Sequence, residues 1–326
     1  MPEPSLHWGA ETLWEQLLPL LPGLSVEVVR SVPSTNTALL ARARVSPDLE
    51  VTDGDVQVRR SVESAAFGRR AVDIAPCLLI AENQTAGRGR QGRSWQSAAG
   101  ASLTFSLGVP LTVPDWSGLS LAVGVALCEA IEAIRTPASN APRLGLKWPN
   151  DLWLGEPGEG GRKLGGLLIE TVAAGSQRLA VIGVGINVEP FAADAVTTGF
   201  ACAQELDPSI TAPALMTRLA LPLVQAVLLF GEVGFGAFET RFAARDLLVG
   251  KTVRTTSPEL PDGVAQGVSS RGALRLATAS GVHELSSGEV SVRVASGNET
   301  GALDDNAHTI ADANTKTNDG ASRRRR

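Results

Sequence analysis

AENQTAGRGRQGRSW, residues 81–95, carries glycines in the pattern Gly87-x-Gly89-x-x-Gly92, which is the spacing of a dinucleotide-binding fingerprint. In a doubly wound parallel fold, such glycines follow a strand and open a helix whose N-terminus holds a pyrophosphate. The apolar run CLLIAE before the segment predicts the strand. The residues after it, RSWQSAAGASLTFSLG, have no helical apolar period and run into a second strand. The segment therefore excludes a Rossmann domain and indicates a glycine-rich loop between two strands.

Short strands with short connections dominate the rest of the chain. Strands are expected at residues 26–29, 77–82, 102–109, 144–148, 151–154, 163–172 and 179–188, and helices at 11–21, 34–44, 116–135 and 212–245. Because the four pieces between 144 and 188 leave no room for crossover helices, they favour an α+β fold with a mixed or antiparallel sheet. Three later apolar stretches, broken by turn residues, predict a small β-barrel of about five strands.

These elements predict two domains and two less regular segments. We expect a first domain at 1–246 and the barrel at 247–295. Residues 45–72 are polar and charged and resemble an inserted loop. Residues 296–326, which end in four arginines, are expected to be disordered.

Composition argues against several classes of protein. The net charge of −5 gives no global attraction to nucleic acid or acidic membranes. The longest apolar stretch, residues 119–131, is interrupted by Glu129 and is too short to span a bilayer. No signal segment for export opens the chain. Cys77, Cys128 and Cys202 are widely spaced, which suits buried thiols in a reducing compartment, so we expect a cytoplasmic protein.

The cations of the glycine-rich loop suggest a ligand. Arg88, Arg90 and Arg93 lie between or beside its glycines, and guanidinium groups bind carboxylates and phosphates in bidentate fashion. Glycines also allow the loop to open and to close over an anion. A solvated basic turn is the alternative. Lysines are rare, with four among 29 cationic residues, so Lys147 and Lys163 are of interest where they occur.

Three further motifs carry chemistry-bearing residues. In LKWPND (146–151), Pro149 breaks the strand and presents Asn150 and Asp151 at a corner, which suits either Mg²⁺ beside phosphates or a plain Asx turn. KLGGLLIE (163–170) and GVGINV (183–188) place glycines within strands, where a flat ligand can lie against the backbone; a bulge or a tight helix contact is the alternative. The three histidines form no cluster, so histidine base catalysis is not expected.

Together these motifs resemble the biotin protein ligases, also called biotin–[acetyl-CoA-carboxylase] ligases. The matching segments, in order, are Ser34-Thr35-Asn36, Gln84 with AGRGRQGRSW, KWPNDL, KLGGLLIE, GVGINV and, in the barrel, GALRL (272–276) and GEVSVR (288–293). The resemblance covers roughly residues 31–293.

The resemblance implies a class II aminoacyl-tRNA synthetase-like catalytic domain followed by an SH3-like barrel. It implies that biotin and ATP, with Mg²⁺, give biotinyl-5′-AMP and pyrophosphate. Biotin then passes to one lysine of a biotin carboxyl carrier protein or domain of acetyl-CoA carboxylase or a related carboxylase.

The resemblance also implies roles for individual residues. The implied catalytic residues are Lys163, Arg88 and Arg90, with Lys163 bridging the biotin carboxylate and the α-phosphate. The implied biotin site consists of Ser34, Thr35, Asn36, Gln84, Gly87, Arg88, Arg90, Lys163 and Gly166. The implied ATP and adenylate site consists of Arg93, Trp95, Lys147, Asn150, Asp151 and Asn187, with Asp151 as the Mg²⁺ ligand.

Two alternatives stay open at this point. A lipoate–protein ligase shares the fold and the adenylation chemistry, and a non-catalytic biotin or adenylate sensor would bind without turnover. About thirty residues precede Ser34, too few for a winged DNA-binding domain, so no DNA partner is expected, and no membrane partner. The sequence leaves open whether the protein is a monomer or a homodimer, which carboxylase subunit it modifies, whether the glycine-arginine loop is ordered without ligand, and what 45–72, the loop 155–162 and the tail do.

Overall fold

The computed structural model describes residues 6–44, 74–174, 177–191, 199–286 and 291–295. The helices are α1 (Ala10–Leu17), α2 (Thr35–Arg44), α3 (Leu119–Glu132), α4 (Ala212–Val233) and α5 (Glu239–Ala243), with 3-10 turns η2 (Arg90–Gly92), η3 (Ala203–Glu205) and η4 (Phe235–Phe238). The strands are β1 (Ser25–Val32), β2 (Cys77–Gln84), β3 (Gly87–Arg88), β4 (Ser94–Trp95), β5 (Ser102–Pro110), β6 (Leu144–Lys147), β7 (Asp151–Leu154), β8 (Arg162–Ala174), β9 (Gln177–Asn187), β10 (Thr252–Thr255), β11 (Asp262–Val268), β12 (Leu274–Thr278), β13 (Gly281–Leu285) and β14 (Val292–Val294).

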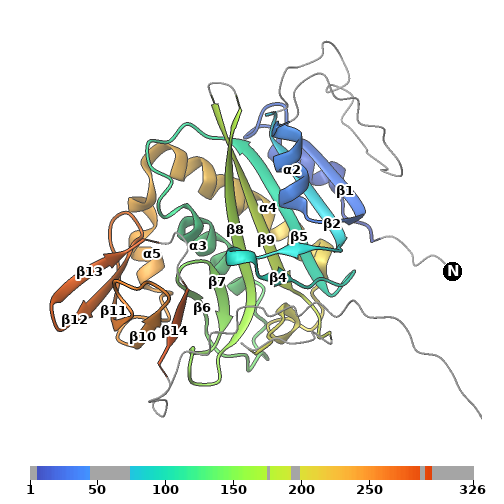
Figure 1. Ribbon diagram of the computed structural model, residues 1–326. Helices are drawn as coiled ribbons and strands as arrows, with labels where there is room; N and C mark the ends of the chain where they lie inside the picture. Colours follow the sequence, from blue (N-terminus) through green and yellow to red (C-terminus); the bar gives the residue numbers. More distant parts are fainter. Residues whose placement is uncertain (1–5, 45–73, 175–176, 192–198, 287–290, 296–326) are drawn as a thin grey trace, which may run out of the picture. The chain divides into compact units, whose positions relative to one another are not determined.

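A seven-stranded sheet in the order β1-β2-β5-β9-β8-β7-β6 forms the centre of the protein (Figure 1). Its β1–β2 pair is parallel and the other neighbours are antiparallel. No helix follows the glycines of residues 87–92; they belong to the β3–β4 hairpin. The mixed sheet of an α+β fold is therefore confirmed, and the Rossmann alternative is excluded.

The two faces of this sheet follow the period of two along its strands. On β5, Leu103, Phe105 and Leu107 belong to the main core, whereas Ser102, Thr104 and Ser106 point the other way. Helices α3 and α4 pack over the main core, and α2 packs over the opposite face. In Figure 1, α2 and the β3–β4 hairpin lie in front of the sheet and α4 lies behind it. The polar face of the sheet is thus the face that α2 and the hairpin cover.

Two helices are each bounded at one terminus by a glycine with a positive φ. Helix α3 begins at Leu119, later than expected, because Gly118 has φ 84, which a right-handed helix cannot include. Helix α4 ends at Val233, before Gly234 with φ 69. By length and mean hydropathy (1.7), α4 could cross a membrane, but half of that apolar window is buried inside the protein. Its contact with α3 marks it as a core helix.

A second, five-stranded antiparallel sheet in the order β13-β12-β11-β10-β14 forms the small C-terminal barrel. This confirms the expected class II synthetase-like fold followed by an SH3-like module. The Trp148 indole, which is fully buried, donates a 3.0 Å hydrogen bond to the Gly272 carbonyl and so joins the two sheets. The domain boundary at 246/247 stays a prediction.

The three cysteines are buried and free, as expected. The predicted insertion at 45–72 and the predicted disordered tail at 296–326 lie outside the described residues.

Candidate active site

One cavity of about 690 Å³ lies on the face of the sheet that α2 and the hairpin cover. Every site residue expected from the sequence lines it except Gly87. These lining residues are Ser34, Thr35, Asn36, Gln84, Arg88, Arg90, Arg93, Trp95, Lys147, Asn150, Asp151, Lys163, Gly166 and Asn187. They come from α2, five strands and the hairpin. The fold therefore gathers into one place residues that the sequence spreads over about half of its length.

The cavity floor arises from the alternation along β9. Leu179 and Val181 face α2, and the next positions on that face are Gly183, Gly185 and Asn187. A Cβ on Gly185 would lie 2.5 Å from the Trp95 ring, so the indole rests directly on the bare backbone. One face of β9 therefore packs against α2 at Leu179 and Val181 and borders the cavity at the glycines that follow.

The glycine-arginine segment forms a hairpin over this floor rather than an open loop. Gly87 pairs with Trp95, and a Cβ on Gly87 would overlap the Trp95 carbonyl oxygen, so this position requires glycine. At the tip, Arg93 donates to the Ser291 hydroxyl (2.8 Å), which donates to Gln91 Oε1 (2.7 Å). The hairpin is thus docked on the C-terminal barrel as well as on the sheet.

The start of α2 forms one end of the cavity. Gln84 Oε1 accepts hydrogen bonds from the Thr35 amide (2.8 Å) and hydroxyl (3.1 Å). This leaves the Gln84 amide group to donate elsewhere. Asn36 donates to Leu168 O and to Glu170, and it accepts from Ser106 (2.6 Å). Because these protein groups already use its amide, Asn36 shapes the cavity wall more than it offers hydrogen bonds to a ligand.

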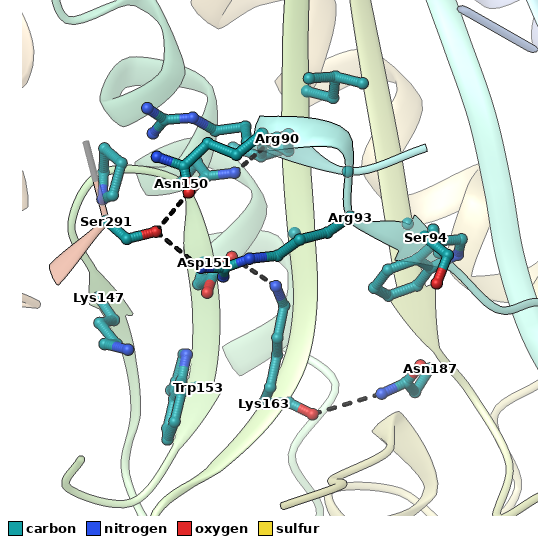
Figure 2. Close-up of a pocket in the computed structure, with 18 of the residues that line it drawn as sticks. Arg90, Arg93, Ser94, Lys147, Asn150, Asp151, Trp153, Lys163, Asn187 and Ser291 are labelled. Carbon is teal, nitrogen blue, oxygen red and sulfur yellow. Dashed lines mark hydrogen bonds and ion pairs between the residues drawn. The ribbon is translucent and has the colours of Figure 1, made fainter. Parts of the chain in front are cut away.

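An ion pair lies at the centre of the cavity. Lys163 Nζ is 2.7 Å from Asp151 Oδ1, and both groups border Gly166, as Figure 2 shows for the pair. Asn150, at the corner before β7, donates to the Leu167 carbonyl (2.5 Å) and fixes that corner. Asn187 donates to the Ala201 carbonyl (2.9 Å). Lys163 therefore borders the cavity, paired with one carboxylate and still partly exposed.

The opposite end of the cavity is strongly cationic. Burial lowers the pKa of Lys147, and Lys163, Arg293 and Arg93 lower it further, against the opposing effect of Asp151. Burial likewise lowers the pKa of Arg90. Cations that are held together and partly desolvated form a site for a polyanion, since the anion relieves their repulsion.

Arg88 points away from this cluster. Its guanidinium donates to Glu170 (3.1 Å) and to the Thr37 hydroxyl (3.3 Å), so it anchors the hairpin on α2 and β8. Its expected contact with a ligand stays a prediction.

Some lining residues were not expected from the sequence. One is Trp153, whose ring centre lies 4.7 Å from Lys147 Nζ in a cation–π contact that Figure 2 shows side-on. The loop between β7 and β8 and residues 291–294 of the barrel complete the wall. Within the described residues, the indole nitrogens of Trp95 and Trp153 are buried without an acceptor. The sequence signal for Trp153 was hidden, because in DLWL it has the appearance of an ordinary core residue.

The donor set is compatible with Mg²⁺ that arrives together with phosphates. Asp151 is the only carboxylate among the described residues that line the cavity, and these residues contain no group of three or more His, Cys, Asp or Glu side chains placed to hold a metal. Mg²⁺ requires only one or two protein carboxylates when phosphate and water complete its shell. Asp151 could supply one such oxygen.

Comparison with known proteins agrees with this geometry. Residues 74–187 match the Biotin/lipoate A/B protein ligase family, and residues 249–293 match the biotin protein ligase C terminal domain. A biotin--[acetyl-CoA-carboxylase] ligase of Mycobacterium tuberculosis is 32% identical over 293 residues, covering 86% of this chain and 91% of the relative. The bifunctional ligase/repressor BirA of Escherichia coli is 30% identical over 301 residues, covering 90% and 81%. A solved structure of the Aquifex aeolicus biotin protein ligase in complex with biotin and ATP shares the fold, with a TM-score of 0.61 at 24% identity, covering 83% of this chain and 99% of that one.

The family matches over both the catalytic domain and the C-terminal module show that the protein is a ligase. The chain belongs to the biotin protein ligase family.

Proposed function

We propose that the protein activates biotin with ATP to biotinyl-5′-AMP and transfers biotin to one lysine of a biotin carboxyl carrier protein or domain of acetyl-CoA carboxylase or a related carboxylase. The observation that carries this proposal is the single cavity in which a hydrogen-bonding end at α2 faces a cationic end at Lys147. Lys163 lies between the two ends.

In the first step a biotin carboxylate oxygen attacks the α-phosphorus, the bond from that phosphorus to the bridging oxygen breaks, and pyrophosphate leaves. Two anions must approach each other, so groups that stabilise the developing charge act mainly in the transition state. Lys163 is assigned to the carboxylate and the α-phosphate, and Arg90 to the biotin carboxylate. Arg93 and Lys147 are assigned to the remaining phosphates, where Mg²⁺ held by Asp151 would supply further charge neutralisation.

In the second step the acceptor lysine amine attacks the biotinyl carbonyl, a new amide bond forms, and AMP leaves. No nucleophile of this chain is required, because the attacking amine belongs to the acceptor lysine. The hairpin, with Trp95 on Gly185, would exclude water from the adenylate until the acceptor arrives.

The lipoate ligase and the non-catalytic sensor are the rival functions. The match of residues 249–293 to the biotin protein ligase C terminal domain supports biotin as the acid. The Lys163–Asp151 pair and the cationic end support turnover over simple sensing. We further propose a cytoplasmic enzyme that acts without DNA or membrane partners; the buried free cysteines fit such a reducing compartment.

Pyrophosphate exchange tests the proposal directly. With ATP, Mg²⁺ and labelled pyrophosphate, we expect label to enter ATP when biotin is added and not when lipoate is added. Exchange with lipoate alone would transfer the protein to the lipoate ligases. Saturable biotin binding without any exchange would instead support the sensor.

The affinity for ATP should fall as the pH rises. Lys147 is a cation only below its pKa, which burial lowers from the ordinary value of 10.5. Its attraction for the triphosphate is therefore lost at a lower pH than for an ordinary lysine. Calorimetric titration with ATP between about pH 7 and pH 10 measures this, and Lys147→Arg, whose guanidinium stays charged, should flatten the profile. An unchanged profile in Lys147→Arg would assign the titration to another group.

A further inference from the structure

The loop between β7 and β8, residues 155–161, connects the cavity with the barrel. Pro157, Gly158, Gly160 and Gly161 line the cavity. Gly158 has φ 83, and a Cβ there would lie 3.0 Å from Val294 Cγ1 of β14. The sequence alone left the role of this loop open, and the structure places four of its residues in the cavity wall.

One lysine of the barrel holds this loop. Lys251 Nζ is 3.0 Å from Glu159 Oε1 and 3.5 Å from Glu156 Oε2, and its side chain is only 18% exposed. The hydrogen bond to Glu159 raises the pKa of Lys251, so the side chain stays cationic at any pH at which the enzyme is assayed. Glu156 also lies 3.7 Å from Arg143 Nη1 at the start of β6. Three ion pairs therefore connect the loop with the barrel and with the start of β6.

The place of the loop suggests what this attachment achieves. Residues 157, 158, 160 and 161 and the barrel residues 291–294 form the wall beside the cationic end of the cavity. The loop itself is rich in glycine, so its backbone would lose much conformational freedom on ordering around a ligand. A tie that orders it beforehand reduces this cost of binding.

We propose that Lys251 is a positioning residue for the nucleotide: by holding Glu156 and Glu159 it keeps the 155–161 loop and the barrel wall in the geometry that receives the triphosphate. The inference rests on the proposed function in taking ATP as the ligand of the cationic end. It concerns a contact made by this chain's own loop, not one of the residues assigned to substrate.

Two variants that break the same contact with opposite changes of charge test the proposal. Lys251→Ala removes a cation, and the double variant Glu156→Gln with Glu159→Gln removes two anions. Both should raise the dissociation constant of ATP, measured by calorimetry, by about three- to tenfold, the size expected for loss of one or two partly exposed ion pairs. If Lys251 acted only through its charge, the double glutamine variant would bind ATP as tightly as the native protein or tighter, and the proposal would be wrong.

Matched controls separate positioning from folding. Arg275→Ala, an exposed barrel cation on β12 that does not line the cavity, should leave the affinity for ATP unchanged. Lys251→Arg, which keeps the cation, should largely retain the native affinity for ATP. The loop amides of Glu159 and Gly161 both donate to the Glu156 carbonyl. In Lys251→Ala and in the double glutamine variant, these amides should exchange their hydrogens faster than in the native protein. Unchanged exchange and unchanged ATP affinity would overturn the proposal.

The ATP titrations and the hydrogen exchange do not depend on which acid the enzyme activates. In steady-state pyrophosphate exchange we expect the KM for ATP to rise in Lys251→Ala while the KM for biotin and kcat stay close to native values. If the native protein shows exchange with lipoate instead, the proposed function fails, yet the ATP titrations and the hydrogen exchange still decide the role of Lys251.

Discussion

Replacing Lys163 by alanine should lower biotin-dependent pyrophosphate exchange by about 10²- to 10³-fold, by analogy with the loss on removal of a single preorganised hydrogen-bond donor from an active site. Two physical effects combine. The variant lacks the ammonium group that lies between the two ends of the cavity, and it leaves Asp151, 2.7 Å away in the native protein, without its cation. An unpaired carboxylate beside Gly166 repels the incoming phosphates.

A second variant separates these two effects. Lys163→Ala combined with Asp151→Asn removes the uncompensated carboxylate and, with it, the oxygen proposed to hold Mg²⁺, so exchange recovered over Lys163→Ala alone would show that the repulsion by Asp151 outweighs its contribution to Mg²⁺ binding. Arg275→Ala serves as a control for the loss of a cation outside the cavity. Lys163→Ala should unfold at a temperature close to that of the native protein, because the lysine side chain is partly exposed and packs no core. Exchange within about threefold of native would show that Lys163 does not bridge the reacting groups.

Local patterns in the sequence predicted the strands, the absence of a helix after the glycine-rich segment, and the glycines that share one face of β9. The strands β2, β5, β8 and β9 appear where period-two and apolar runs placed them. The exclusion of a Rossmann domain held because RSWQSAAG cannot form an amphipathic helix, and the structure has the β4 strand there. The glycine pair Gly183 and Gly185 also lies on one face of β9, as its spacing required.

Contacts between distant segments could not be predicted in the same way. The Arg93–Ser291 hydrogen bond joins residues 198 positions apart, and nothing in either local sequence marks the other. Trp153 has the composition of a core strand residue, yet it supports Lys147 at the cavity. Arg88 was grouped with Arg90 because both alternate with glycines, but hairpin geometry turns Arg88 toward Glu170. The sequence motifs thus indicated which residues gather, while the direction of each side chain depended on tertiary packing.

A second large effect is expected at the floor of the cavity. Gly183→Ala should destabilise the protein by about 2–3 kcal/mol and weaken biotin binding, because the new methyl group overlaps Asn36. The built Cβ would lie 2.9 Å from Asn36 Cγ and closer still to Oδ1. Asn36 cannot move at low cost, since it is buried and its amide is bonded to Leu168 O, Glu170 and Ser106. Any shift must displace the start of α2, which carries Ser34 and Thr35.

Urea denaturation of the native protein and of Gly183→Ala measures the loss of stability, and calorimetry with biotin measures the loss of affinity. Gly231→Ala is the matched control, because its new Cβ would meet only Leu111 Cδ2 at 3.5 Å, an ordinary contact. Since Gly231 lies inside α4, alanine there should leave stability unchanged or raise it by up to about 1 kcal/mol. Native-like stability of Gly183→Ala would mean that Asn36 and the α2 start can rearrange, and that the bare backbone at this position is not what shapes the biotin end of the cavity.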